Sequence, residues 1–414
     1  MVYICVLAAI QHRYTTALTL NSFMQAIKFN SFKDFFTSKS AGGVLLLLCV
    51  IISLTIANSG VSEEYSNILS TELGRNFGNI ILRYPTILWI NDGLMAIFFL
   101  LVGLEIKREL IEGELSSPKQ AALPVFAAIG GMIVPALIFS LFNNNTSTSA
   151  GWGISMATDI AFAIAVLSLL GDRVPLALKI FLTALAIVDD LGAILVIAIF
   201  YSSEIHYDYL GYAGLVVVFL IILNRFKVMN YAFYLIPGLL MWYFIHHSGI
   251  HATIAGVLTA LTIPTTPDDT ESPLEKLEHL LTKPVNFIIM PLFALANTNI
   301  TFEQGMIDGL YSNMGLGILC GLLLGKPIGI VIMSWISVKT GLSSLPANAK
   351  WMQIVALGIL AGIGFTMSIF IAMLSYKQIE LQTQAKFAIL IASLLAGIIG
   401  YVLLNVFSRR IKNE

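Results

Sequence analysis

Four ionisable residues lie deep within long apolar stretches of the sequence: Asp159, Asp189, Asp190 and Lys326. A charge at the centre of a lipid bilayer costs at least about 2.5–3.5 kcal/mol on insertion scales, so residues of this kind usually face a cavity and serve a function. If all four are ionised, three carboxylates and one ammonium group leave two surplus negative charges. An apolar medium cannot solvate that surplus, so protons or a small cation would have to neutralise it.

Asp189 and Asp190 are adjacent and fall near the middle of the apolar stretch 175–200. Successive residues of an α-helix project about 100° apart, so the two carboxylates cannot share one direction. One of them can face an ion site while the other faces a neighbouring helix. A structural ion pair is the alternative. It would explain one buried acid but not two adjacent acids at this depth, and we predict a functional role.

Thr158 and Asp159 interrupt the apolar stretch 151–170, which is short and flanked by glycines. This pattern favours a discontinuous helix, in which backbone carbonyls and helix ends are exposed near the midplane of the membrane. Asp159 would then neutralise the positive N-terminal ends of half-helices. The alternative is an acid that is hydrogen-bonded inside an unbroken helix.

The stretch 352–374 repeats this pattern, because Gly362, Gly364 and Thr366 interrupt an otherwise apolar run. If spans three to five and ten to twelve are inverted repeats, the two broken helices would occupy matching places. A glycine-lined packing face between helices is the alternative explanation.

Lys326 lies in Gly325-Lys326-Pro327, too deep in its stretch to reach water by extending its side chain. It needs an acid partner, and Asp189 is our first choice. A buried lysine is also a candidate proton carrier. Carboxylates, the Thr158 hydroxyl and free carbonyls form an all-oxygen set that suits a hard cation such as sodium. Competition between protons and that cation would couple their movements.

The composition indicates a chain embedded in a lipid bilayer. Of its 414 residues, 57% are hydrophobic and 11% are charged, whereas soluble domains carry about 25% charged residues. The net charge of −1 provides no field that would attract nucleic acid, so we expect no nucleic-acid partner. Three cysteines in apolar contexts are typical of buried thiols rather than of a disulfide framework.

The apolar stretches predict one membrane domain over residues 41–408. An N-terminal cytoplasmic arm (1–40) precedes it, either an interfacial helix or an unstructured segment, and a cytoplasmic tail (409–414) follows it. A spanning helix needs about 20 apolar residues. The expected spans are 43–59, 87–106, 121–143, 151–170, 175–200, 209–223, 230–247, 249–263, 284–300, 312–337, 352–374 and 385–408. The longest loop beyond the second span is expected between Pro264 and Lys283.

The basic residues predict the orientation of these spans. Placing the N-terminus in the cytoplasm puts 17 Lys and Arg residues on the cytoplasmic side and 4 on the other side, with 2 inside spans. Cytoplasmic loops of membrane proteins carry such an excess. We therefore predict that both termini are cytoplasmic.

Six segments, in order over roughly residues 35–408, resemble the NhaA family of bacterial sodium/proton antiporters. They are Ala157-Thr158-Asp159-Ile160-Ala161-Phe162, Ala186-Ile187-Val188-Asp189-Asp190-Leu191-Gly192, Ser248-Gly249-Ile250-His251-Ala252-Thr253-Ile254-Ala255-Gly256, Pro291-Leu292-Phe293-Ala294-Leu295-Ala296-Asn297, Gly325-Lys326-Pro327 and Gly362-Ile363-Gly364-Phe365-Thr366-Met367-Ser368. Any one of these segments would be a weak signal, but together they are highly specific.

The resemblance implies an all-α polytopic fold of twelve helices, in which helices 4 and 11 are broken and cross each other. It implies that Asp189 and Asp190 bind Na⁺, with Thr158 and Asp159 beside them and Lys326 compensating charge. It implies that Na⁺ or Li⁺ leaves the cell as protons enter across the bacterial inner membrane. No cofactor is expected. If one cation displaces more than one proton, the exchange is electrogenic.

The resemblance also implies activation at alkaline pH through a cluster that matches Glu105, Arg108, Glu109, Glu278 and His279. The first three are neighbours on one helix face by their spacing, and a histidine among acids titrates near physiological pH. The alternative is a solvated helix end with ordinary salt bridges.

Two further residues bear on the pH response. Thr282 stands where some relatives carry a second histidine. His251 follows two other histidines near the outer surface, where it either senses pH or is simply hydrated. A homodimer that forms through the outer segment 58–85 is a family expectation.

Three other functions compete with antiport. A sodium-coupled organic solute symporter could use the same scaffold, but we would expect more polar or aromatic groups near the broken helices. An intramembrane aspartyl protease needs its two acids on two helices, whereas these are adjacent on one. A channel suits half-helices and charge-compensated carboxylates less well than alternating access does. We expect a transporter rather than an enzyme.

Overall fold

The computed structural model of the chain describes residues 41–76, 82–202, 204–266, 271–303 and 305–411. The predicted N-terminal arm, 1–40, and the last residues of the predicted tail, 412–414, lie outside the described residues. The described part is helical except for a short antiparallel ribbon, in which β1 (Glu72–Leu73) pairs with β2 (Tyr84–Pro85). The expected all-α membrane architecture is confirmed at this level.

The described residues contain seven helical stretches that are long and apolar enough to cross a membrane, and up to nine if each of two bent pairs is one span. The bent pairs are α3 (Ala41–Ala57) with α4 (Ser62–Ser70), and α18 (Trp351–Ala361) with α19 (Phe365–Ser375). The seven are Thr86–Ile111, Pro118–Asn143, Leu176–Phe200, Tyr207–Arg225, Pro273–Asn297, Asn313–Lys339 and Ile379–Ser408. A total of twelve stays a prediction.

Three of these stretches contain a π-helical turn between α-helices. They run through α5 (Thr86–Leu88), η1 (Trp89–Leu94) and α6 (Met95–Ile111); α13 (Pro273–Pro284), η4 (Val285–Ile289) and α14 (Met290–Asn297); and α16 (Asn313–Cys320), η5 (Gly321–Gly325) and α17 (Lys326–Lys339). π-turns inside helices are frequent at functional sites.

The remaining elements complete the chain order. They are α7 (Pro118–Asn143), η2 (Ser149–Gly153), α8 (Ile160–Leu169), η3 (Gly171–Arg173), α9 (Leu176–Phe200), α10 (Tyr207–Arg225), α11 (Ala232–Ser248), α12 (Ile254–Thr262), α15 (Met306–Leu310) and α20 (Ile379–Ile411). The last helix continues to Ile411, three residues beyond the predicted end of the membrane domain.

The prediction of a loop from Pro264 to Lys283 is wrong for its second half, because α13 begins at Pro273. Ser272 and Glu275 form a capping box there. Glu275 N donates to the Ser272 hydroxyl, and the Glu275 carboxylate accepts from Ser272 N at 2.8 Å. A capping box with proline at the first helical position is a strong helix start. The helix then runs without a loop into the predicted ninth span.

The predicted eighth span, 249–263, contains a shorter helix than expected. Gly249 ends α11 with φ of +85°, a conformation that glycine adopts without steric cost. Only α12, of 9 residues, follows.

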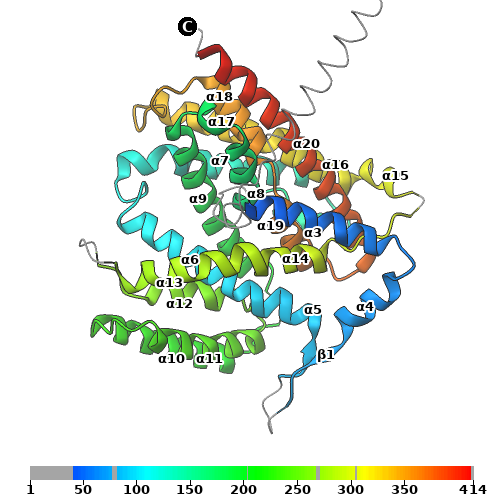
Figure 1. Ribbon diagram of the computed structural model, residues 1–414, viewed down its shortest axis with the longest axis vertical. Helices are drawn as coiled ribbons and strands as arrows, with labels where there is room; N and C mark the ends of the chain where they lie inside the picture. Colours follow the sequence, from blue (N-terminus) through cyan, green and yellow to red (C-terminus); the bar gives the residue numbers. More distant parts are fainter. Residues whose placement is uncertain (1–40, 77–81, 203, 267–270, 304, 412–414) are drawn as a thin grey trace, which may run out of the picture.

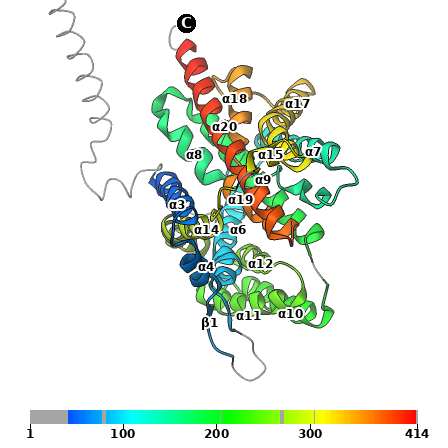
Figure 2. The ribbon, with the colours of Figure 1, turned by 90° about the vertical axis from the view of Figure 1, so that its right-hand side faces the viewer.

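Figure 1 places α8, α9 and α19 near the centre of the molecule, between a group that contains α7, α17 and α18 and a group that contains α6, α12 and α14. Figure 2, turned by 90°, shows α9 and α19 again in the middle. The helices α10 and α11 pack against each other and belong to a second, smaller hydrophobic cluster with α12. The predicted ion-binding helices therefore occupy the core of the fold.

The helices α7 and α17 approach each other closely at Gly130 and Gly329. A Cβ atom added to either glycine would overlap the carbonyl oxygen of the other. Backbone carbonyls cannot move aside as flexible side chains can, so this contact requires glycine on both helices. Small residues allow membrane helices to pack backbone against backbone.

We expect Gly329→Leu to destabilise the folded protein by about 1–3 kcal/mol or more, the usual cost of overpacking a tight interior. The midpoint of thermal unfolding in detergent measures this. Gly214→Leu on α10 is the matched control, because a Cβ there meets no atom within 4 Å. Equal midpoints for the two variants would contradict the proposed contact.

Candidate functional site

The predicted fourth span is interrupted at its centre. Residues 154–159 form turns and irregular backbone and separate a 3₁₀ turn, η2, from α8. Asp159 begins α8, since its Oδ1 accepts a hydrogen bond of 2.9 Å from Phe162 N. The expected break is therefore present, but the chain before it forms a 3₁₀ turn rather than an α-helix.

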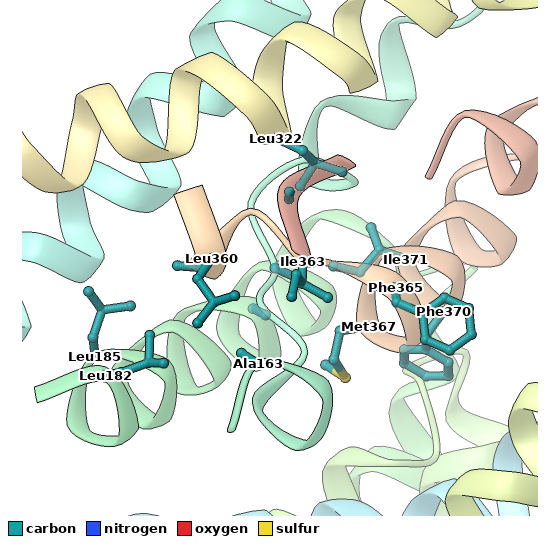
Figure 3. Close-up of a cluster of buried hydrophobic side chains, with 14 of the residues drawn as sticks. Ala163, Leu182, Leu185, Leu322, Leu360, Ile363, Phe365, Met367, Phe370 and Ile371 are labelled. Atoms are coloured by element: carbon teal, nitrogen blue, oxygen red, sulfur yellow. The ribbon is translucent and has the colours of Figure 1, made fainter. Parts of the chain in front are cut away.

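The predicted eleventh span is also interrupted, at Gly362-Ile363-Gly364, where α18 and α19 meet at a bend of 47°. Figure 3 shows Leu360, Ile363 and Phe365 at this bend, with Ala163 of α8 nearby. A Cβ at Gly362 would overlap the Leu322 carbonyl oxygen, so glycine is required there.

The two interruptions lie against each other and exchange hydrogen bonds. Asp159 N donates to Ile363 O at 2.6 Å. The Thr158 hydroxyl donates to Ala361 O at 3.0 Å, which satisfies a carbonyl at the end of α18. Backbone groups released by each break are thus paired by the other, as an apolar environment demands.

One carboxylate serves the N-terminal ends of two helices. Asp159 caps α8 with one oxygen, and its Oδ2 accepts hydrogen bonds from Thr366 N and the Thr366 hydroxyl in the first turn of α19. Asp159 and Thr366 are both buried. Since helix N-termini carry partial positive charge, the ends of α8 and α19 offset the buried negative charge of Asp159.

Lys326 and Asp189 form a buried ion pair of 2.7 Å between Nζ and Oδ2, with side chains that are 0% and 1% exposed. This is the partner that the sequence predicted. Lys326 also donates to Met156 O, the last residue before the first break. It follows the π-turn η5 directly. The lysine therefore links α17, α9 and the broken fourth span.

Asp190 points away from this pair and lines a cavity of about 1120 Å³ together with Asp159 and Thr366. Asp189, Thr158 and Lys326 are not among the lining residues. Adjacent aspartates on one helix thus have different surroundings, as the 100° step predicts. The cavity continues to Glu105, Glu109 and other residues at the end of α6 that is predicted to be cytoplasmic.

Two carboxylate oxygens of the site, Asp189 Oδ1 and Asp190 Oδ1, are buried and have no hydrogen-bond partner among the described residues. Buried polar atoms are nearly always paired, so an unpaired acceptor needs an explanation. A bound proton or cation would satisfy these two oxygens.

Two of the five residues of the predicted pH cluster, Glu105 and Glu109, line this cavity, and two more are ion-paired beside them. Arg108 forms ion pairs with Glu278 at 3.0 Å and with Glu109 at 3.2 Å, and Glu105 lines the cavity one helical turn away. Glu278 is 5% exposed. His279 lies apart: its side chain is 70% exposed and pairs with Glu271 at 3.3 Å.

His251 belongs to a separate group of residues that does not line the large cavity. Asp92 in η1 lies between His246, at 3.0 Å, and His251, at 3.6 Å. His251 also contacts the Thr253 hydroxyl at 2.9 Å.

Sequence reasoning missed two tyrosines that hold the chain before the first break. The Tyr201 hydroxyl, just beyond α9, donates to Ala150 O at 2.8 Å. The Tyr376 hydroxyl, just beyond α19, donates to Thr148 O at 2.9 Å. Nothing in the sequence distinguishes these tyrosines from other residues at helix ends.

Comparison with known proteins agrees with this architecture. The family model for "Na+/H+ antiporter 1" matches residues 33–404. The chain is 63% identical over 389 residues to a Flavobacterium johnsoniae protein named Na(+)/H(+) antiporter NhaA 2, an alignment that covers 94% of this chain and 95% of the relative.

More distant relatives carry the same name. Na(+)/H(+) antiporter NhaA of Flavobacterium psychrophilum is 52% identical over 370 residues, which covers 89% of this chain and 94% of the relative. The Citrobacter koseri protein of that name is 48% identical over 371 residues, with coverage of 89% and 96%. The match spans every element of the site described above, and the chain belongs to the NhaA-type Na⁺/H⁺ antiporter family.

Proposed function

We propose that the chain exchanges Na⁺ for protons across the bacterial inner membrane, and that both ions compete for Asp190 and Asp189. The observation that carries the proposal is the unpaired oxygen of Asp190 at the inner end of an open cavity, next to the lysine-paired Asp189. The names of the relatives support sodium/proton exchange.

A cation that enters the cavity would reach Asp190 first, because Asp190 is the member of the pair that lines it. The described residues contain no group of three or more His, Cys, Asp or Glu side chains placed to hold a metal. The remaining ligands would therefore be hydroxyl and backbone oxygens, with Thr158 beside the pair, and water. Such hard oxygen ligands suit Na⁺ and Li⁺.

Charge balance supplies the coupling in this proposal. With Lys326 protonated and paired to Asp189, the surplus charge resides on Asp190, and either a proton or Na⁺ would neutralise it. If Na⁺ also draws Asp189 away from Lys326, the proton held by the pair leaves as well, from Lys326 if the pair is an ammonium and a carboxylate, or from Asp189 if it is a neutral amine and a neutral acid. Two protons then leave for one Na⁺, and the exchange is electrogenic. Neither step needs a cofactor.

We further propose the finer architecture that this exchange requires. Twelve helices would include two inverted repeats, helices 3–5 and 10–12, whose broken members cross at the site. Asp159, Thr158 and the glycines at 362 and 364 would keep the crossing intact while the surrounding helices move. Both termini would be cytoplasmic, with one membrane domain over 41–408, and two copies would pair through the segment 58–85.

Activation at alkaline pH would reside in Glu105 and Glu109, which line the cavity that leads to Asp190. Arg108 and Glu278 would act with them, since Arg108 joins Glu109 to Glu278. Their protonation would change the field that an entering cation meets. His279 and His251 would act from more distant positions. No observation in the described residues favours the alternative of an organic solute symporter.

Asp190→Asn should abolish the dequenching of a pH-sensitive dye that Na⁺ causes in inverted membrane vesicles, because the amide cannot exchange a proton for a cation. Asp189→Asn should be severely impaired, unless Lys326 carries the second proton. The matched control is Asp208→Asn, which changes an exposed residue of α10. A full Na⁺ response in Asp190→Asn would refute the proposal.

Lys326→Met should lower the free energy of unfolding by about 3–5 kcal/mol, the usual cost of leaving one buried charge of a pair unpaired. Lys326→Met with Asp189→Leu should recover most of that loss, because neither charge remains. Thermal unfolding midpoints in detergent give the comparison, with the exposed Lys119→Met as the control. A double variant as unstable as the two single variants combined would contradict the pairing.

Arg108→Gln should move the pH of half-maximal exchange upward by about one pH unit. Without the guanidinium, Glu109 and Glu278 lose the cation that they share, and the loss of a nearby positive charge favours the protonated form of a carboxyl group. The dye assay across a pH series measures the shift. Arg225→Gln, at the last turn of α10, serves as control. An unchanged profile in Arg108→Gln would remove this cluster from the pH response.

A further inference from the structure

A second cavity, of about 610 Å³, lies between α3, α8 and α20 and contains almost only apolar side chains. We call it the α20 groove. Its lining residues are Leu47, Val50, Ile51, Leu54, Phe162, Val166, Leu169, Phe302, Ile363, Phe365, Phe387, Leu390, Ile391, Ser393, Leu394, Gly397, Ile398, Tyr401 and Val402. The Ser393 hydroxyl in it is already occupied, since it accepts a hydrogen bond of 3.1 Å from Phe365 N.

Helix α8 is the wall between this groove and the large cavity that leads to Asp190. Ile164 and Leu167 face the large cavity, whereas Phe162, Val166 and Leu169 face the groove. The neighbouring α3 seals the wall, because Gly43 lies so close to Ala165 that a Cβ on the glycine would overlap it. A molecule bound in the groove would therefore pack against α8, the helix that Asp159 caps, on the face opposite the large cavity.

The groove also reaches the second break. Ile363 and Phe365 line it, and these residues flank Gly364 at the bend between α18 and α19. Gly397 of α20 keeps the groove open at this level, since a Cβ there would meet only Ile363 Cδ1, at 3.6 Å. A larger side chain at 397 would extend into the groove rather than into the backbone.

The dimensions of the groove match an acyl chain. Phe387 and Val402 are 15 residues apart on α20, which corresponds to about 22 Å at 1.5 Å per residue. The hydrocarbon core of a bilayer is about 30 Å thick. Leu394 and Ile398 are more than half exposed. They lie on a helix that is long and apolar enough to cross a membrane, so we expect lipid beside them.

A positively charged side chain lies at one end of the groove. Arg173, in η3 just after α8, is exposed and donates to Asn405 Oδ1 of α20 at 2.9 Å. Asn405 is one helical turn beyond Tyr401 and Val402, the last groove residues. A guanidinium that is held in place in this way matches a phosphate group.

We propose that the α20 groove binds one acyl chain of a membrane phospholipid, whose phosphate lies at Arg173. The bound lipid packs against the face of α8 that is opposite the large cavity and restricts the movement of this helix. The lipid fits the apolar lining, the length and the charge at the end. Residues 1–40, which precede α3 in the chain, and a second copy of the chain are the other candidate occupants. The proposal does not depend on which ions are transported.

Lipid retention tests the groove. Purified full-length protein is stripped of lipid, supplied with phosphatidylglycerol and measured by native mass spectrometry. Gly397→Phe should retain one phospholipid fewer per chain than the wild type. Gly214→Phe, a control at an exposed position of α10, should retain as many as the wild type. Leu394→Trp provides a second filling variant, with Leu239→Trp, which is 68% exposed on α11, as its control.

A second comparison tests whether the phosphate of the lipid lies at Arg173. Wild-type protein should prefer phosphatidylglycerol to diacylglycerol, which lacks the phosphate, and Arg173→Gln should lose that preference. Lys386→Gln, near the other end of the groove, should keep it. If Lys386→Gln loses the preference and Arg173→Gln keeps it, the placement of the phosphate at Arg173 is wrong.

Hydrogen–deuterium exchange measures whether the bound lipid restricts the opening of α8. Added phosphatidylglycerol should slow exchange in residues 160–169 of the wild type and leave Gly397→Phe unchanged. A photoreactive residue at position 394 identifies the occupant. A phospholipid adduct supports the proposal, whereas crosslinks to residues 1–40 or to a second copy overturn it. Equal lipid retention by Gly397→Phe and Gly214→Phe also overturns it.

Discussion

The cost of an ionised group in an apolar interior governs the centre of this protein. Every charge there must be balanced within a few ångströms, because water is not available to solvate it. Lys326 balances Asp189 at 2.7 Å, and the first turns of two helices balance Asp159. Asp190 has no such protein partner among the described residues. We propose that this unbalanced carboxylate is the reason that the site binds cations and protons.

The two helix breaks follow from the same constraint. A broken helix in an apolar environment exposes backbone groups that must be paired inside the protein. Here each break pairs groups of the other, since Asp159 N donates to Ile363 O and the Thr158 hydroxyl donates to Ala361 O. Lys326 of α17 pairs one more released carbonyl, Met156 O. Gly364 lies at this contact, because a Cβ atom there would come within 3.0 Å of the Ala157 carbonyl oxygen. The breaks and the buried charges therefore form one mutually dependent unit.

The parts of this unit that carry a large energetic cost could be predicted from the sequence. Four charges in apolar stretches stood out, the pairing of Lys326 with Asp189 followed from charge balance, and glycines and hydroxyls marked both interruptions. Features with a smaller energetic cost left no comparable pattern in the sequence. The π-turns, the tyrosine contacts to Thr148 and Ala150, and the position of Asp92 between two histidines depend on three-dimensional neighbours.

The start of α13 shows a different limit. A loop was expected from Pro264 to Lys283, between two apolar stretches, but a capping box and a proline at the first helical position begin a helix at Pro273. The apolar groove beside α8 was also outside the reach of sequence patterns. Its walls come from segments more than 300 residues apart, and each segment alone resembles an ordinary membrane helix.

Calorimetry of sodium binding tests the central claim most directly. If Na⁺ and protons occupy the same carboxylates, binding must release protons. The measured heat will then change in proportion to the ionisation enthalpy of the buffer. A binding heat that is the same in buffers of widely different ionisation enthalpy, at a pH where the protein binds Na⁺, would show that no proton leaves and would contradict the account.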